Sequence, residues 1–325
     1  MRIEEARAIS VKLAEEVRNA VRPLMGKPSA RGYEKQGISG DVTFRIDEVA
    51  EVVVVNILEE LTDIAFYTED RGLTVSGRPD FVLVIDPIDG TRPAVAGLES
   101  CCVSVAAAPF SIGKEAELTL GDVAFALVAE IKSGRHFTAE KGSGFQAFVD
   151  GKTIEPALHP IDDYSSVFWS TGFRGRPAEP LVIVLGDLID MTSVNGGLFD
   201  LGSATFSIVR VVMGELDLYL DVGQRMADES EAVMELFLKL GRGAVLNNYP
   251  HDLAAAALIA REAGCIITDA YGNSLSDYRL LPEKGKGQIS SVFTRDADFH
   301  RFIIEQIEIG MRRLVERYGG CASIK

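Results

Sequence analysis

The stretch Val84-Ile85-Asp86-Pro87-Ile88-Asp89-Gly90-Thr91 decides how this chain folds and what chemistry it offers. The apolar run from Phe81 to Ile85 predicts a buried strand, and two carboxylates three positions apart follow it directly. The proline between them restricts the backbone, and the glycine lets the backbone come close to a ligand. Open α/β sheets bind ligands at the carboxyl ends of strands, and hard oxygen ligands beside a helix start suit a phosphate bound with Mg²⁺. The alternative is a plain aspartate-rich turn.

The composition of the 325 residues is that of an ordinary globular protein, with 47% apolar and 25% charged residues. The formal net charge of −15 argues against nucleic acid or an anionic membrane surface as a partner. The same charge repels an anionic substrate, so a phosphate site would need metal ions that reverse the local sign. The cysteines lack metal-ligand spacing, and we expect buried or incidental thiols in a reducing cytoplasm. They are Cys101, Cys102, Cys265 and Cys321.

The N-terminal residues show no basic region followed by an apolar core, so we expect no signal peptide. No apolar run reaches the length that spans a membrane. The four histidines are scattered, which argues against a histidine-based zinc site, and no catalytic triad can be assembled from the sequence. We therefore expect a soluble, cytoplasmic protein.

Hydrophobic periodicity predicts a chain of mixed α/β class. Helices are expected at about 3–25, 47–61, 180–190, 203–214, 228–240, 252–264 and 296–318. Strands are expected at 64–67, 81–85, 103–108, 123–131, 136–139, 144–149, 167–170, 217–221, 265–268 and 290–294, with a charged loop over 68–80. Turn residues at 133–134 and 150–151 predict an antiparallel portion. We place a subdomain boundary near residue 160, giving an N-terminal α+β part (1–160) and a C-terminal α/β part (161–325) that completes the site.

Asp86 and Asp89 cannot complete a metal site alone, so other acids must lie at the ends of elements. The candidates are Asp47, Glu69, Asp70 and Asp252. Each also has a plainer interpretation. Asp47 and Asp252 stand at helix starts, where aspartate is a common N-cap, and the acids after residue 68 would be solvated loop charges.

The order of the acidic motifs is far more specific than any one of them. In chain order they are Gly40-Asp41-Val42-Thr43 with Asp47 and Glu51, then Thr68-Glu69-Asp70, then Asp86-Pro87-Ile88-Asp89-Gly90-Thr91, then Asp252 with Glu262-Ala263-Gly264. This order resembles the inositol monophosphatase superfamily, which includes inositol monophosphatases, archaeal-type fructose-1,6-bisphosphatases and 3′(2′),5′-bisphosphate nucleotidases. The likeness extends from residue 1 to about residue 295. It implies a layered α-β-α-β-α sandwich.

The resemblance also implies a role for each matched residue. The metal ligands would be Glu69, Asp86, the backbone carbonyl of Ile88, Asp89 and Asp252. Asp47 and Thr91 would orient the attacking water, with Glu69 as a further partner of that water, and the amides of Gly90 and Thr91 would cradle the phosphate. The mechanism would be a displacement assisted by two or three Mg²⁺ ions, with Mn²⁺ as an alternative.

On the substrate side, Gly202 and Ser203 match a family segment that contacts substrate hydroxyl groups, although a helix N-cap is an equal interpretation. Asp221 matches an acid that binds a substrate hydroxyl, unless it is a solvated acid at a strand end. Arg92 stands where the family commonly has a small residue. Its guanidinium would grip a second phosphate or a carboxylate, and the alternative is a surface arginine at a helix start.

Other departures from the family pattern concern neighbouring positions. His251 stands where the family usually has tryptophan, and Thr68 replaces a glycine. Extra residues separate Asp221 from Asp252, and their pattern suggests an inserted helical segment near 222–250, with a helix at 227–240.

We therefore expect a Mg²⁺-dependent phosphomonoesterase acting on a small polyol or sugar phosphate, with inositol monophosphate and fructose-1,6-bisphosphate as leading substrates. One alternative is a 3′(2′),5′-bisphosphate nucleotidase, although Phe199 is the one aromatic residue between 194 and 202 that could stack an adenine. Another is a non-catalytic dimeric relative with a regulatory or binding role. The retained acids argue against it. As partners we expect a small phosphorylated metabolite and a second copy of the chain, in a homodimer or homo-oligomer.

Overall fold

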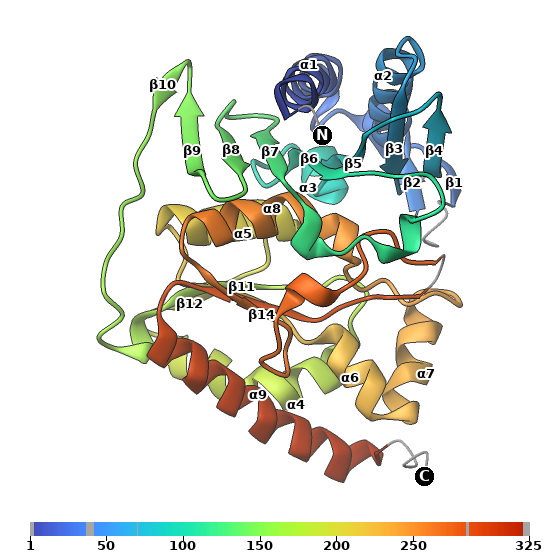
Figure 1. Ribbon diagram of the computed structural model, residues 1–325. Helices are drawn as coiled ribbons and strands as arrows, with labels where there is room; N and C mark the ends of the chain where they lie inside the picture. The colour runs from blue at the N-terminus through green and yellow to red at the C-terminus, as the bar shows by residue number, and fades with distance from the viewer. Residues whose placement is uncertain (1–2, 37–41, 70, 284–285, 321–325) are drawn as a thin grey trace.

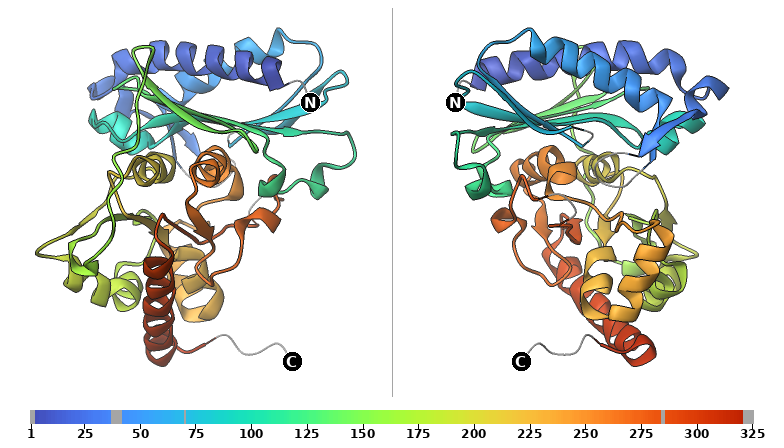
Figure 2. Two further views of the ribbon diagram at one scale, coloured as in Figure 1. Left: turned by 60° about the vertical axis from the view of Figure 1, so that its left-hand side comes forward. Right: turned by 90° about the vertical axis from the view of Figure 1, so that its right-hand side faces the viewer.

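The computed structural model describes residues 3–36, 42–69, 71–283 and 286–320, so Gly40, Asp41, Asp70 and Cys321 lie outside the described residues. Helices and sheets alternate in five layers (Figure 1 and Figure 2). The outer face of the first sheet is covered by α1 (Ile3–Val21) and α2 (Arg45–Glu59). Between the two sheets lie α5 (Ala204–Met213) and α8 (Pro250–Glu262). The outer face of the second sheet is covered by α4 (Ala178–Thr192), α6 (Gly223–Glu229), α7 (Glu231–Leu240) and α9 (Ala297–Tyr318). The predicted α-β-α-β-α sandwich is confirmed.

The first sheet has eight strands in the order β10-β9-β8-β7-β6-β5-β3-β4. Their bounds are β3 (Ile64–Thr68), β4 (Gly72–Ser76), β5 (Phe81–Asp89), β6 (Cys102–Pro109), β7 (Phe125–Glu130), β8 (His136–Glu140), β9 (Gly144–Val149) and β10 (Lys152–Thr153). Of the neighbouring pairs of strands in this sheet, only β3 and β5 are parallel, and Tyr67 of β3 lies opposite Val84 of β5. The parallel pair therefore carries the carboxyl ends of two strands to the same edge, where Glu69 and Asp86 lie.

The second sheet has five strands in the order β12-β11-β13-β15-β14. Their bounds are β11 (Phe168–Thr171), β12 (Gly197–Phe199), β13 (Leu218–Asp221), β14 (Ile266–Thr268) and β15 (Ser291–Thr294). Strand β11 runs parallel to both β12 and β13, and β15 is antiparallel to β13 and β14. A two-stranded antiparallel ribbon, β1 (Tyr33–Gln36) with β2 (Val42–Phe44), precedes α2.

Strand β5 is apolar at successive positions because both of its faces are covered. Phe81, Leu83 and Ile85 belong to the core under α1 and α2. Val82 and Val84 belong to the core that includes α5 and α8. A strand buried on both sides has a continuous apolar run rather than an alternation, which explains the apolar residues from Phe81 to Ile85.

Helix α8 fits between the two sheets because its residues are small. Ala254 to Ala257 and Ala260 are at most 1% exposed and share a core with Phe206 and Ile208 of α5. Both helices come from the second half of the chain, yet they cover the first sheet (Figure 2). The chain crosses from the first sheet to the second between Thr153 and Phe168. The subdomain boundary near residue 160 stays a prediction.

Three edge strands of the two sheets, β4, β10 and β12, were not predicted from the sequence. The prediction of a charged loop over 68–80 was wrong for β4, which pairs with β3 along its whole length. Leu73 and Val75 of β4 are 37% and 40% exposed, so the strand has no buried face that would give an alternating pattern. Strand β12 is a second short edge strand, with Leu198 and Phe199 also exposed.

The predicted helix at 227–240 is two helices, α6 and α7, which meet at Ser230. The Ser230 side chain accepts a hydrogen bond from the Val233 amide and so begins α7 as its N-cap. Met226, Val233 and Phe237 are fully buried in the core with α4 and α9. The segment is therefore part of the main core and not a detachable addition. Of the described helices, none combines the length and apolar character needed to cross a bilayer.

Candidate active site

The carboxyl end of β5 presents the central acids. Asp89 is the last residue of β5, Gly90 has a φ of +92°, and α3 (Thr91–Ala96) begins at the next residue. A Cβ atom at position 90 would lie 2.4 Å from the carbonyl oxygen of Ser100, so only glycine fits this close turn. The predicted order of strand, carboxylates and helix is confirmed, and it places both aspartates at the carboxyl end of β5.

Hydrogen bonds fix the two aspartates in different ways. The amide of Ile88 donates to Asp86 Oδ1 at 2.9 Å. Asp89 Oδ2 accepts from Ser203 Oγ at 2.8 Å and from the Thr205 amide at 2.6 Å. Ser203 is also the N-cap of α5, because its Oγ accepts from the Phe206 amide. Asp89 is therefore held by the middle helix layer, across the interface between the two halves of the chain.

Thr91 and Asp47 meet as the resemblance implied. Thr91 Oγ1 donates to Asp47 Oδ1 at 2.8 Å, although 44 positions separate the two residues. The other oxygen of Asp47 accepts from the Phe44 amide at 2.8 Å and so supports the start of α2. Asp47 thus supports the helix start and binds the threonine. The N-cap interpretation of Asp47 and Asp252 was wrong, because the N-caps of α2 and α8 are Phe44 and Tyr249 and each aspartate is the third helical residue.

Asp252 has the same place in α8 that Asp47 has in α2. It is the third residue of the helix, and its Oδ2 accepts from the Tyr249 amide at 2.7 Å. Both helices begin two residues earlier than predicted. The other carboxylate oxygen of Asp252, Oδ1, lies 3.3 Å from His251 Nε2.

These residues surround one cavity of about 370 Å³. The predicted site residues that line it are Glu69, Asp86, Ile88, Asp89, Gly90, Thr91, Arg92, Gly202 and Asp252. Lining residues that were not predicted from the sequence include Arg174, Asp200, Leu246, Asn247 and Tyr249. The cavity draws on both halves of the chain, because the second group comes from the loops after β11, after β12 and before α8.

Three predicted residues lie behind the cavity wall. Asp47 supports Thr91, and Ser203 supports Asp89, as described above. Asp221 was expected to bind a substrate hydroxyl group or to be solvated, and neither expectation matches its surroundings. Its side chain is 0% exposed and forms an ion pair with the equally buried Arg176. The structure therefore places Asp221 and Ser203 as supporting residues, because their acceptor and donor atoms are already engaged inside the protein.

The carboxylates of the cavity repel one another. Burial, followed by the charges of Asp89, Glu69 and Asp252, raises the pKa of Asp86 well above its ordinary value. Burial also raises the pKa of Asp89, against the lowering effect of its hydrogen-bond donors. Burial, opposed by the hydrogen bond from Tyr249, raises the pKa of Asp252 to about 7. A bound cation would relieve this repulsion and return the acids to their charged forms.

The donor set has the chemistry that Mg²⁺ prefers, namely carboxylate and carbonyl oxygens without competing soft ligands. In the described part of the chain, no three acidic, histidine or cysteine side chains converge closely enough to form a ligand cage by themselves. The four acids instead face a common cavity with room between them. The residues fit magnesium by type and by charge.

His251 is an aromatic support rather than a charged ligand. Its ring stacks on Tyr249 with centroids 5.1 Å apart and lies 4.8 Å from the Tyr67 ring. Burial lowers the pKa of His251 to about 4, so the ring is neutral at physiological pH. The departure from tryptophan noted in the sequence thus preserves a flat ring at this position, next to Asp252.

A model described as the inositol monophosphatase family matches residues 2–310 of the chain. The chain belongs to this family. Family membership makes it a phosphatase and confirms the resemblance inferred from the motifs.

Similar proteins agree with this assignment. The fructose-1,6-bisphosphatase/inositol-1-monophosphatase of Methanothermobacter thermautotrophicus is 26% identical, over 93% of this chain and 96% of its own length. The bifunctional NADP phosphatase/NAD kinase of Methanocaldococcus jannaschii is 25% identical over 96% of this chain, which spans only 53% of that relative. The solved structure of an IMPase from Thermotoga maritima has the same fold, with a TM-score of 0.67 at 20% identity, covering 95% of this chain and 99% of that one.

Proposed function

We propose that this family member is a Mg²⁺-dependent phosphomonoesterase that hydrolyses a small polyol or sugar phosphate, with inositol monophosphate and fructose-1,6-bisphosphate as the leading substrates. One observation carries the proposal. Glu69, Asp86, Asp89 and Asp252 line the same cavity as Thr91, whose hydroxyl is bonded to Asp47. A cytoplasmic location and assembly as a homodimer or homo-oligomer stay predictions.

The acids and the Ile88 carbonyl would hold the magnesium ions, which when bound lower the pKa of a water molecule and offset charge on the phosphoryl oxygens. Thr91 directs its hydrogen to Asp47, so the lone pairs of Oγ1 are available to accept a hydrogen bond from the attacking water. Asp47 therefore fixes the direction in which the threonine acts. The backbone amides of Gly90 and Thr91 are expected to bind the phosphate oxygens.

A phosphate-release screen tests this proposal. The purified chain would be given a panel of polyol, sugar, nucleotide and aryl phosphates, with and without Mg²⁺. We expect release that depends on Mg²⁺ and is fastest for a polyol or sugar phosphate. Release from none of the esters at saturating Mg²⁺ would remove the proposal and favour a non-catalytic relative.

A second candidate substrate class is the phosphorylated nucleotides. The Methanocaldococcus jannaschii relative is named for an NADP phosphatase activity, and Tyr249 of this chain lines the cavity. Tyr249 is 7% exposed and its ring stacks on His251, so a base would contact only the part of the ring that lines the cavity. Fastest release from NADP or from a 3′,5′-bisphosphate nucleotide in the same screen would favour this class over sugar phosphates.

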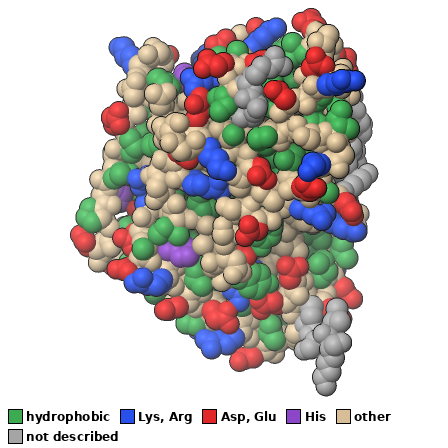
Figure 3. Space-filling view, in the orientation of Figure 1, with side chains coloured by type: hydrophobic (Ala, Val, Ile, Leu, Met, Phe, Trp, Pro, Cys, Tyr) green, Lys and Arg blue, Asp and Glu red, His purple; other side chains and the backbone are tan. Residues whose placement is uncertain are grey.

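Replacing Arg92 by alanine is expected to weaken binding of a substrate that carries a second anionic group. Arg92 lines the cavity, and its guanidinium lies 5.7 Å from the centre of the Phe44 ring, which orients it. Acidic and basic side chains are interspersed over the face shown in Figure 3, so local cations rather than a broad positive field would attract such a substrate. Loss of a charged hydrogen bond should weaken substrate binding by about 1.5–3 kcal/mol, which would be measured as a higher KM.

The measurement compares KM of the parent and the Arg92→Ala variant for fructose-1,6-bisphosphate and for a monophosphate. The monophosphate serves as the control and should change little. Equal increases for both substrates would show that Arg92 contacts the phosphate under attack, and the bisphosphate would then rank below inositol monophosphate.

The stability of the metal-free protein is expected to fall as the pH rises from about 4 to about 7. In this range the unfolded chain has ionised Asp252, while the folded protein still holds the proton because its pKa is raised to about 7. Mg²⁺ displaces that proton, so the thermal stabilisation by Mg²⁺ should be larger near pH 8 than near pH 5. Melting temperatures with Mg²⁺ and with a chelator would measure this.

The matched variant for this experiment is Asp252→Asn, which removes the titrating group. Its metal-free melting temperature should depend less on pH than that of the parent, and its gain from Mg²⁺ should be smaller. A parent protein whose metal-free melting temperature rises from about pH 5 to about pH 8 would contradict the prediction, because another group would then dominate the linkage.

A further inference from the structure

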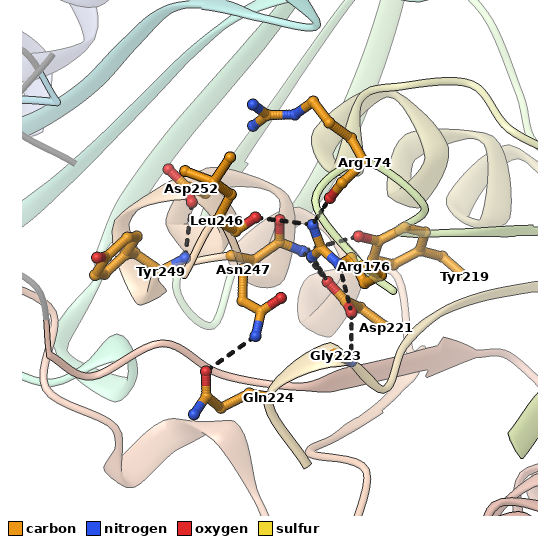
Figure 4. Close-up of polar contacts among 11 residues, drawn as sticks. Arg174, Arg176, Tyr219, Asp221, Gly223, Gln224, Leu246, Asn247, Tyr249 and Asp252 are labelled. Atoms are coloured by element: carbon orange, nitrogen blue, oxygen red, sulfur yellow. Dashed lines mark hydrogen bonds and ion pairs between the residues drawn. The ribbon is translucent and has the colours of Figure 1, made fainter. Parts of the chain in front are cut away.

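A buried ion pair stands behind one wall of the cavity. Arg176 follows β11, and Asp221 ends β13; their side chains are 3% and 0% exposed. The guanidinium contacts both carboxylate oxygens, through Nη2 to Oδ2 and through Nε to Oδ1 at 3.4 Å (Figure 4). Two-point contact between a guanidinium and a carboxylate fixes orientation as well as distance.

The pair joins two loops that are distant in sequence. Arg176 Nη1 donates to the carbonyl of Leu246 at 2.9 Å. Asp221 accepts from the Gly223 amide at 2.8 Å and from Asn248 Nδ2 at 3.0 Å. The loop after β11 and the loop before α8 are therefore fastened to the same two side chains, as Figure 4 shows.

Three glycines allow the pair and the two loops to pack closely. A Cβ atom at Gly172 would lie 2.7 Å from Asp221 Oδ2, and one at Gly223 would lie 2.6 Å from Asn247 Oδ1. Gly175, with a φ of +75°, brings its backbone to Leu246, where a Cβ atom would lie 2.9 Å from the Leu246 Cβ. Larger residues at any of these positions would push the two loops apart.

Both fastened loops contribute to the cavity. Arg174 lies two residues before Arg176, and Leu246 and Asn247 come from the other loop; all three line the cavity. Figure 4 shows the Arg174 side chain directed away from Arg176, toward the side on which Asp252 lies. Arg174 thus lines the same cavity as Asp89 and Asp252, so its guanidinium adds a positive charge to the site that holds the acids.

We propose that Arg176 is a positioning residue that sets substrate preference. Together with Asp221 it holds the loop of Arg174 against the loop of Leu246, so that Arg174 binds a second anionic group on the substrate. Asp221 is bonded inside the protein, and this wall therefore recognises charge rather than a hydroxyl group. The inference rests on the proposed phosphatase function and deepens it, because it names phosphate esters with a second anionic group as the favoured class.

Kinetics with two probes test the proposal. We would measure KM and kcat for fructose-1,6-bisphosphate and for p-nitrophenyl phosphate, at saturating Mg²⁺, in the parent and in Arg176→Met, Arg174→Ala and the double variant. For each single variant, the ratio of the bisphosphate KM to the aryl phosphate KM should rise roughly tenfold to a hundredfold. The double variant should show the ratio of Arg174→Ala alone, because Arg176 acts through Arg174.

The matched control is Arg225→Met. Arg225 is another buried arginine, paired with Glu229 and Glu308, and it is not among the residues that line the cavity. Its loss should lower the melting temperature without changing the KM ratio. The milder variants Arg176→Lys and Asp221→Asn decide the matter if Arg176→Met does not fold.

Two results would overturn the proposal. The first is a KM ratio that stays at the parent value in every folded Arg176 and Asp221 variant. The second is a KM ratio in the double variant that rises by the product of the two single increases. Failure of the underlying function is distinguishable, because the parent itself would then release phosphate from neither probe, and the inference would fall with it.

Discussion

Asp86→Asn is expected to abolish Mg²⁺-dependent turnover while the fold stays intact. The substitution keeps the volume of the side chain and removes one of the four expected ligand charges from the cavity. It should not destabilise the metal-free protein, because burial and the neighbouring acids already raise the pKa of Asp86 and so disfavour its charge. Magnesium binding, by contrast, depends on that charge.

Asp89→Asn should also abolish turnover, with a greater effect on stability. Asp89 Oδ2 accepts from both Ser203 and Thr205, and an amide nitrogen in place of that oxygen would face two donors. A buried donor left without an acceptor costs about 1–3 kcal/mol. Comparison of the two variants thus separates the effect of losing a metal ligand from the effect of losing the hydrogen bonds between β5 and α5.

The measurements are kcat over a range of Mg²⁺ concentrations, Mg²⁺ affinity by calorimetry, and the melting temperature. Asp200→Asn provides the control, because Asp200 also lines the cavity but was not assigned to the metal. Its turnover should stay within about tenfold of the parent, a loss below about 1.4 kcal/mol. Turnover within tenfold of the parent in both Asp86→Asn and Asp89→Asn would refute the assignment of the metal ligands.

The sequence predicted those parts of the site that depend on one element and its end. The β5 motif shows a buried strand, two acids and a glycine that must turn, and each of these is local. The Asp47–Thr91 pair was predicted because the motif order carried the resemblance, and the structure confirms their hydrogen bond. An apolar run and the order of motifs are properties of the chain itself, so they can be recognised without the fold.

What the sequence did not reveal depends on which loops meet in space. Arg174 follows the end of β11 just as Asp86 stands near the end of β5, yet no local signal shows that these two ends face one cavity. Asp221 was placed correctly at a strand end, but its role is decided by Arg176, 45 positions away. A motif gives the position of an acid, and only the tertiary structure gives its partner.

Thr91→Ala is expected to lower kcat by roughly 10²–10⁴, the usual effect of losing positioned acid–base assistance, with little change in Mg²⁺ affinity. The hydroxyl donates to Asp47 at 2.8 Å and lies 3.2 Å from the carbonyl of Ile88, so its orientation is fixed. Removing it takes away the oxygen that is expected to accept a hydrogen bond from the attacking water. The acids assigned to the metal keep their contacts, which is why metal affinity should persist.

Thr91→Ser is the matched control, since it retains the hydroxyl and loses only a methyl group; most of the activity should remain. The alanine and serine variants would be compared by kcat at saturating Mg²⁺ and by Mg²⁺ titration. A different outcome has a clear meaning. If Thr91→Ala weakens Mg²⁺ binding and leaves kcat at saturating Mg²⁺ unchanged, the hydroxyl supports the turn between β5 and α3 instead of the water, and Asp47 is then a helix-start residue that holds that turn.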